Sequence, residues 1–153
     1  MNNIVIVSGG FDPVHKGHIQ LFNDAATYGS VYVCLNSDEW LTRKKGKPFM
    51  SFQERKYILE NIKAIKLVAP MKDDDNTACD GILSIYKAVQ ETLAQSILYR
   101  IRGIRLFFAN GGDRQTENTP EIDLCKKLGI KLLWNIGGGK TQSSSDLLKN
   151  WTE

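Results

Sequence analysis

Residues 9–18 have the sequence GGFDPVHKGH, and they separate two stretches of opposite character. Ile4–Val7, before them, is a continuous apolar run, which is typical of a buried strand. Residues 19–26, after them, have the apolar spacing of an amphipathic helix. The chain therefore predicts a strand, a glycine turn and a helix in direct succession.

This predicted turn has the features of an anion-binding site. The first turn of a helix carries N–H groups that have no partner within the helix, together with the positive end of the helix dipole. Gly9 and Gly10 allow the backbone to approach a ligand closely. His15 and His18 are the two histidines of the chain, and their spacing places them on one face of the helix start. We interpret both histidines as functional residues.

Composition limits the class of protein. The 153 residues, 42% apolar and 24% charged, fit one soluble globular domain spanning residues 1–153. A net charge of +3, from 20 basic and 17 acidic residues, argues against nucleic-acid binding. The three cysteines are isolated and lack zinc-site spacing, which favours reduced thiols in a cytoplasmic protein. We expect no signal peptide and no membrane span, since no apolar run approaches about 20 residues.

Apolar runs alternate with helical patterns along the whole chain, which predicts a parallel sheet covered by helices on both faces. The predicted strands are Ile4–Val7, Val31–Leu35, Ile65–Ala69, Ile104–Ala109 and Ile130–Trp134. The predicted helices are Gly17–Thr27, Phe52–Ile62, Cys79–Ile101, Pro120–Leu128 and Ser144–Trp151.

Local signals sharpen some of these boundaries and leave one open. Thr119 before Pro120 predicts a helix start, and Gly129 predicts the end of the same helix. The segment Cys79–Ile101 is either one long helix or two short ones with a break near Gln95 and Ser96. Asp73–Asn76 is predicted to be a surface loop.

The HxGH pattern of residues 15–18 resembles the motif of the small nucleotidyltransferase superfamily, the cytidylyltransferase-like enzymes. Three later segments resemble family elements and follow in the family's order. Residues 44–55, KKGKPFMSFQER, resemble the basic loop and the following E-R helix. Residues 109–114, ANGGDR, resemble the loop after the fourth strand, and residues 141–145, TQSSS, resemble the late serine-rich phosphate loop.

The resemblance implies a single Rossmann-like, doubly wound α/β domain with five parallel strands in the order 3-2-1-4-5. Ligands of such sheets bind beyond the carboxyl ends of the strands, where the connections diverge. The resemblance assigns His15, His18 and Lys44 to catalysis and Arg55 and Arg114 to the acceptor. The nucleotide site would comprise Gly9, Gly10, Phe11, Asp12, Gly17, Lys47, Gly112, Asp113, Thr141, Ser143, Ser144 and Ser145.

Several of these assignments have alternatives. In the basic loop, Lys45 is a near alternative to Lys44 and Lys47. Arg55 suits a phosphate because its planar fork can bind one through two parallel hydrogen bonds, but it could instead be a surface partner of Glu54 or of a neighbouring acid. Asp12 could orient neighbouring groups, help to hold a metal ion, or serve only as a turn residue before Pro13.

The implied reaction transfers a nucleotidyl group from a nucleoside triphosphate to a small phosphomonoester, such as a polyol or sugar phosphate, with release of pyrophosphate. CTP is favoured and ATP is the alternative, and Mg²⁺ is expected to accompany the triphosphate. We also expect a homodimer, with the apolar segment 81–105 as its contact face. A non-catalytic nucleotide-binding regulatory protein is the alternative of another class. No G-x-x-x-x-G-K-[ST] sequence occurs, so a P-loop is excluded.

Overall fold

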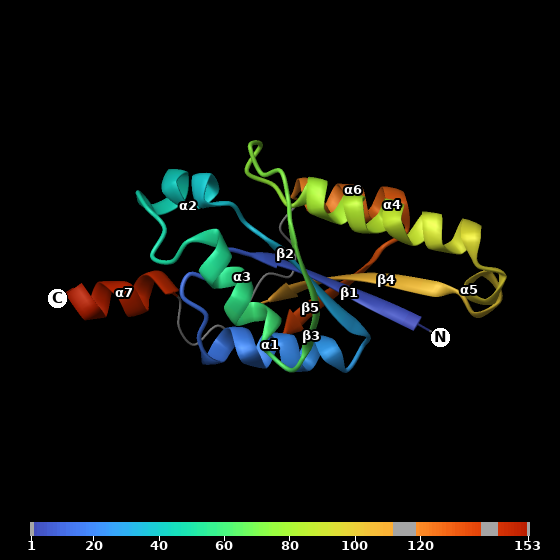
Figure 1. Ribbon diagram of the computed structural model, residues 1–153, viewed down its shortest axis with the longest axis horizontal. Helices are drawn as coiled ribbons and strands as arrows, with labels where there is room; N and C mark the ends of the chain where they lie inside the picture. Colours follow the sequence, from blue (N-terminus) through green and yellow to red (C-terminus); the bar gives the residue numbers. More distant parts are fainter. Residues whose placement is uncertain (1, 112–118, 139–143, 153) are drawn as a thin grey trace.

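The computed structural model describes residues 2–111, 119–138 and 144–152. Within these residues the strands and helices alternate along the chain (Figure 1). The strands are β1 (Asn2–Gly9), β2 (Ser30–Leu35), β3 (Ile65–Pro70), β4 (Ile104–Gly111) and β5 (Lys131–Ile136). The helices are α1 (Lys16–Ala26), α2 (Asp38–Lys45), α3 (Phe52–Glu60), α4 (Cys79–Gln95), α5 (Ile97–Arg102), α6 (Pro120–Leu128) and α7 (Ser144–Thr152).

The five strands form one parallel sheet in the order β3-β2-β1-β4-β5, which confirms the predicted fold. From β1 the chain moves outward through β2 to β3 and then crosses back to β4 on the other side of β1. This reversal places the topological switch point between the carboxyl ends of β1 and β4. The turn at residues 9–18 begins at that point.

Each central strand buries both of its faces. Val5 and Val7 of β1 pack with Phe22 of α1 and Leu59 of α3 on one face of the sheet. Ile4 and Ile6 of the same strand face the other way, into a cluster with α4 and α6. This alternation explains why the sequence of β1 is continuously apolar. In Figure 1, α1 and α3 lie on one side of the sheet and α4 and α6 on the other.

The signals for α6 are confirmed. Thr119 is its N-cap and accepts a hydrogen bond from the Ile122 N–H, and Pro120 occupies the first helical position. Gly129 ends the helix in the left-handed conformation, with φ of 73°. A residue with a Cβ is strained there, so glycine is the natural terminator.

For residues 79–101 the sequence left open whether there is one long helix or two short ones. The segment forms two helices, α4 and α5, with the break at Ser96. The Ser96 hydroxyl accepts from the Tyr99 N–H and starts the second helix. The break turns the chain toward β4, and α5 buries none of its residues.

One helix was not predicted. Residues 42–45, predicted as part of a basic loop, form the last turn of α2. The helix ends at Gly46, which has a φ of 93°. The signals were present in the sequence: Ser37 caps the helix, acidic residues follow it, and basic residues precede the glycine.

None of the helices in the described part of the chain has the length and apolar character of a membrane span.

Candidate active site

The two predicted histidines lie together at the start of α1. His15 is the N-cap residue, and its Nδ1 accepts a hydrogen bond from the Gly17 N–H at 3.1 Å. The His15 N–H in turn donates to His18 Nδ1 at 3.2 Å. The rings stack with their centroids 3.8 Å apart and their planes at 22°. The histidines therefore form one unit fixed by the helix start.

This pattern assigns the tautomer of both rings. A neutral imidazole whose Nδ1 accepts a hydrogen bond carries its proton on Nε2. The N–H groups of Gly17, His18 and Ile19 all donate within the turn, to His15 Nδ1 or to the His15 carbonyl. The sequence predicted unpaired backbone N–H groups at this helix start, whereas in the structure these three are engaged within the turn. Polarisation through each Nδ1 bond strengthens its Nε2–H as a donor.

The ring of Phe11 packs against the histidine pair. Its ring contacts His18 edge-on at 4.9 Å and Phe22 of the core at 5.1 Å, between ring centroids. The residue has a φ of 48°, which is uncommon for a side chain of this size. A Cβ on Gly9 would lie 2.9 Å from the Phe11 ring, so the glycine makes room for it. The Phe11 ring therefore lies between His18 and the core.

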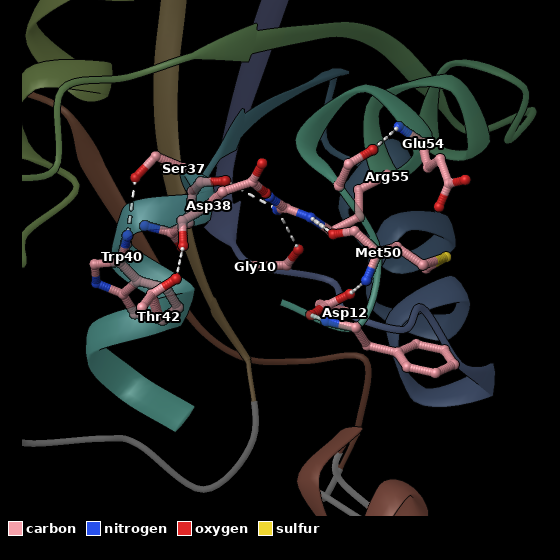
Figure 2. Close-up of polar contacts among 12 residues, drawn as sticks. Gly10, Asp12, Ser37, Asp38, Trp40, Thr42, Met50, Glu54 and Arg55 are labelled. Carbon is pink, nitrogen blue, oxygen red and sulfur yellow. Dashed lines mark hydrogen bonds and ion pairs between the residues drawn. The ribbon is translucent and has the colours of Figure 1, made fainter. Parts of the chain in front are cut away.

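Asp12 is a buried carboxylate, 2% exposed, with every oxygen engaged. Oδ2 and Oδ1 accept hydrogen bonds from the Phe49 and Met50 N–H groups, both at 2.6 Å (Figure 2). Lys45 Nζ lies 2.8 Å from Oδ2 and 2.7 Å from the Asp12 carbonyl oxygen. Asp12 thus orients its neighbours. A role as a metal ligand does not fit these contacts, and no group of three or more His, Cys, Asp or Glu among the described residues could hold a metal ion.

The basic residues of α2 separate into different environments. Lys45 pairs with Asp12, as described above. Lys44 Nζ lies 4.7 Å from the centroid of the Trp40 ring, in a cation–π contact. Lys47 follows the helix and is exposed. The three lysines proposed for the phosphates therefore differ in their contacts. Lys45 binds Asp12 in the turn, whereas Lys44 and Lys47 do not contact Asp12.

Arg55 lies in the interior and not at the surface, and its acidic partner is Asp38 and not Glu54. It is 1% exposed. Nε donates to the Met50 carbonyl at 3.0 Å, and Nη1 donates to the carbonyls of Gly10 and Asn36, both at 2.9 Å. Nη2 pairs with Asp38 Oδ1 at 2.7 Å. In Figure 2 the guanidinium lies among Gly10, Asp38 and Met50.

A second buried carboxylate is Asp73, the first residue of the predicted surface loop 73–76. The structure confirms a loop with residues 74–76 exposed, but Asp73 is buried. It accepts from Asn36 Nδ2 at 3.0 Å, from the Ser37 N–H at 2.8 Å and from the Ser37 hydroxyl at 2.6 Å. Burial opposes its ionisation, but the hydrogen bonds from Ser37 and Asn36 and the charge of Arg43 outweigh burial and lower the pKa of Asp73. Asp73 therefore fixes the start of α2 at the end of β2.

The late serine segment reaches the histidine turn. The Ser144 hydroxyl donates to the Pro13 carbonyl at 2.6 Å, across 131 positions of sequence. Gly137, just after β5, donates its N–H to Asp24 of α1 at 2.8 Å. The first contact places the amino end of α7 beside the turn that precedes α1, and the second ties the residue after β5 to the last turn of α1. The proximity of two helix starts favours an anion between them.

Other predicted site residues lie outside the described residues, namely Gly112, Asp113, Arg114, Thr141 and Ser143. Ser145 lies in α7, and its side chain is outside the description. Sequence reasoning missed four residues that shape this edge: Asn36, Asp38, Trp40 and Asp73. The position of the first three directly after a buried strand could have marked them, because strand ends carry the functional side chains of such folds.

The cysteines offer no nucleophile. Burial raises the pKa of the Cys34 thiol to about 12, with a further increase from the nearby Asp80 carboxylate. Burial also raises the pKa of the Cys125 thiol to about 12. A protonated thiol is a poor nucleophile. All three cysteines of the chain are free.

A doubly wound sheet with paired imidazoles at its switch point defines a class of nucleotide-binding domains. The family model described as Cytidylyltransferase-like matches residues 6–139. The chain therefore belongs to the cytidylyltransferase-like family.

Two curated relatives are similar to this chain in sequence. Over 70 residues the chain is 39% identical to the glycerol-3-phosphate cytidylyltransferase of Bacillus subtilis (strain 168), covering 45% of this chain and 54% of the relative. Over 148 residues it is 38% identical to bifunctional protein HldE of Geobacter metallireducens (strain ATCC 53774 / DSM 7210 / GS-15), covering 94% of this chain and 26% of the relative. The chain spans about half of the Bacillus relative and about a quarter of HldE.

The lipopolysaccharide core biosynthesis protein from Thermoplasma volcanium GSS1 has a similar fold, with a TM-score of 0.57 at 16% identity. The similarity covers 86% of this chain and 94% of that one. At this identity the similarity supports the fold alone.

Proposed function

We propose that the protein is a nucleotidyltransferase that moves a nucleotidyl group from a nucleoside triphosphate to a small phosphomonoester. The observation that carries this proposal is the stacked pair of imidazoles at the switch point, with Ser144 of α7 on the same turn. CTP is the favoured donor and a polyol or sugar phosphate the acceptor. The Bacillus relative, a glycerol-3-phosphate cytidylyltransferase, supports this choice.

The reaction needs no covalent enzyme intermediate. An oxygen of the acceptor phosphate attacks the α-phosphorus of the triphosphate, a new P–O bond forms, and the bond to the bridging oxygen breaks to release pyrophosphate. A phosphomonoester has its second pKa near 6, so it is already an anionic nucleophile at neutral pH. Catalysis is then positioning plus stabilisation of charge on the transferring and leaving groups.

The residues take distinct roles in this proposal. The Nε2–H groups of His15 and His18 donate to phosphate oxygens, and Lys44 and Lys47 neutralise charge on the triphosphate. Because Asp12 is occupied by Lys45 and two N–H groups, Mg²⁺ is assigned to the triphosphate as part of the substrate. The parts of the site outside the described residues, Gly112, Asp113, Thr141, Ser143 and the side chain of Ser145, are proposed to complete the nucleotide site, and Arg114 to meet the acceptor.

ATP is the alternative donor, and pyrophosphate release separates the two. The protein would be incubated with MgCTP or MgATP and a panel of phosphomonoesters that includes glycerol 3-phosphate and several sugar phosphates. Release that requires both substrates supports the proposal, and the favoured triphosphate identifies the base.

Calorimetry with each triphosphate tests the site itself. We expect His18→Ala and Lys44→Ala to weaken binding, whereas Lys56→Gln, which removes an exposed cation of α3, should not. Binding without transfer would favour the regulatory alternative. Equal binding by the parent, His18→Ala and Lys44→Ala would overturn the phosphate-site assignment.

We also propose that the protein is a cytoplasmic homodimer. The three free cysteines suit a reducing compartment. Helix α5 exposes Ile97 and Ile101 by 68% and 78%, which is an apolar surface suited to a second copy. Light scattering at tens of micromolar protein tests this, and a monomer mass would contradict it.

A further inference from the structure

Arg55 connects the anion-binding turn to three other segments through one buried guanidinium. Its hydrogen bonds reach Gly10 in the turn, Asn36 at the end of β2, Asp38 at the start of α2, and Met50 before α3. A guanidinium has five N–H bonds, and these contacts use four of them. A side chain so fully engaged and buried acts on the protein itself.

Two routes lead from Arg55 to the histidines. The direct route is the hydrogen bond from Nη1 to the Gly10 carbonyl at 2.9 Å, one residue before Phe11, whose ring contacts His18. The second route passes through Met50. Its carbonyl accepts from Arg55 Nε, while its N–H donates to the Asp12 carboxylate. Arg55 therefore fixes both ends of the segment Gly10–Asp12, and Figure 2 shows these groups side by side.

The same contacts argue against Arg55 as a ligand of the acceptor phosphate. Bidentate binding of phosphate needs two neighbouring N–H groups on one edge of the guanidinium. One edge combines Nε with Nη2, and the other combines Nη1 with Nη2. Nε is held by Met50, and Nη1 by Gly10 and Asn36, so neither edge presents two N–H groups.

We propose that Arg55 is a positioning residue for nucleotidyl transfer: it holds Gly10 and, through Met50, Asp12, so that the turn presents His15 and His18 to the phosphates. Arg55 does not contact either substrate. This inference rests on the proposed function for its catalytic consequence, but the placement of the histidines can be measured without any turnover.

The chain contains two histidines, so the imidazole region of a ¹⁵N-histidine NMR spectrum reports on both rings without overlap from others. Arg55→Lys keeps the charge, but a single ammonium cannot reproduce the fixed fork of four contacts. In the substrate-free variant we expect the Nδ1 and Nε2 signals of both rings to move from the parent positions. Lys56→Gln, on the same helix and in an exposed ion pair, is the matched control and should leave them in place.

Kinetics then separate positioning from direct contact. We expect Arg55→Lys to lower kcat by about 10- to 100-fold, the scale for a displacement of about 1 Å at a catalytic group. The KM for the acceptor should change less than kcat. Unmoved imidazole signals together with a raised acceptor KM and a retained kcat would overturn the proposal. If the parent shows no transfer, the proposed function fails, and the NMR result still tests the placement of the histidines.

A second variant covers the possibility that Arg55→Lys does not fold. Asp38→Ala removes one of the four contacts and leaves the carbonyl contacts of Arg55 in place. Glu39→Ala is its matched control, since both carboxylates lie in the first turn of α2. Smaller shifts of the same imidazole signals in Asp38→Ala, absent in Glu39→Ala, support the proposal. Identical spectra for the two variants would overturn it.

Discussion

At the carboxyl ends of β1, β2 and β3, polar side chains are buried, whereas at the opposite end of the sheet α5 exposes apolar ones. The buried polar residues among the described part of the chain are Asp12, Asn36, Arg55 and Asp73, all at or near the carboxyl edge. Helix α5 buries none of its residues. In Figure 1, α5 and α2 lie at opposite ends of the sheet.

The two regions differ in how firmly hydrogen bonds fix their conformation. A buried polar group is tolerated only when its hydrogen bonds are satisfied, and a satisfied network allows few alternative arrangements. The carboxyl edge is therefore held in one conformation, as a site that stabilises charge requires. Helix α5 has no such network, so changes there should leave the fold and the histidines unaffected.

The largest effect is expected from breaking the carboxyl edge at Arg55. Arg55→Ala removes the partner of Asp38 and the guanidinium donors to the carbonyls of Gly10, Asn36 and Met50, of which the Asn36 contact is fully buried. We expect the free energy of unfolding to fall by ~1–3 kcal/mol for each buried hydrogen-bonding group left unpaired. The Asp38 carboxylate is 38% exposed, so water screens its charge and replaces part of the lost contact. Urea denaturation of the parent, Arg55→Ala and the surface control Lys56→Gln measures this. A loss below ~1 kcal/mol would mean that the edge does not depend on Arg55.

A comparable effect, on the reaction instead of the stability, is expected at His15. His15→Ala should lower kcat by ~10²- to 10³-fold, the scale for removal of one electrostatic stabiliser. The Kd for nucleotide should change less, because the donor binds more tightly as charge develops. The parent kcat should not rise between about pH 7 and 8.5, because the phosphate nucleophile, with its pKa near 6, is already ionised. A rise that tracks an imidazole and disappears in His15→Ala would make His15 a general base and contradict this mechanism.

A smaller effect is expected at the second carboxylate of the edge. The pKa of Asp73 is lowered from its ordinary value of 3.8, so the folded state favours the ionised form. The stability that this contributes is fully present above pH 3.8 and is lost as pH falls through the lower, folded pKa. Asp73→Asn should cost ~1–3 kcal/mol at neutral pH by leaving donors of Ser37 or Asn36 unpaired. Urea midpoints between about pH 5 and 2 should show less acid dependence in Asp73→Asn than in the parent.

The smallest effect on stability is expected at α5. Ile97→Ser and Ile101→Ser should change the free energy of unfolding by less than ~0.5 kcal/mol, as for exposed positions without partners. If α5 is the contact face of a homodimer, the same variants shift the mass measured by light scattering toward the monomer. A large loss of stability in the isolated monomer would show that α5 belongs to the core and is not a separate exposed helix.

The strands and most helices could be predicted because their signals are local. The apolar run Ile4–Val7 and the caps Thr119 and Gly129 each indicate structure within a few residues. Helix α2 was missed because its many charges were interpreted as a phosphate-binding loop. The histidine pair was predicted from its spacing, and the structure adds which nitrogen of each ring accepts a hydrogen bond.

By itself, the sequence determined the alternation of strands and helices, the turn with its two histidines, and a resemblance that implied the strand order. Only the tertiary structure decided the roles of Arg55, Asp12 and Asp73. Each of the three has a contact with a residue 37 to 45 positions away, and Ser144 reaches Pro13 across 131 positions. A charged residue in a sequence looks the same whether it will meet solvent, a ligand or buried backbone carbonyls. The partner that satisfies its charge exists only after the strands have brought distant segments to one edge.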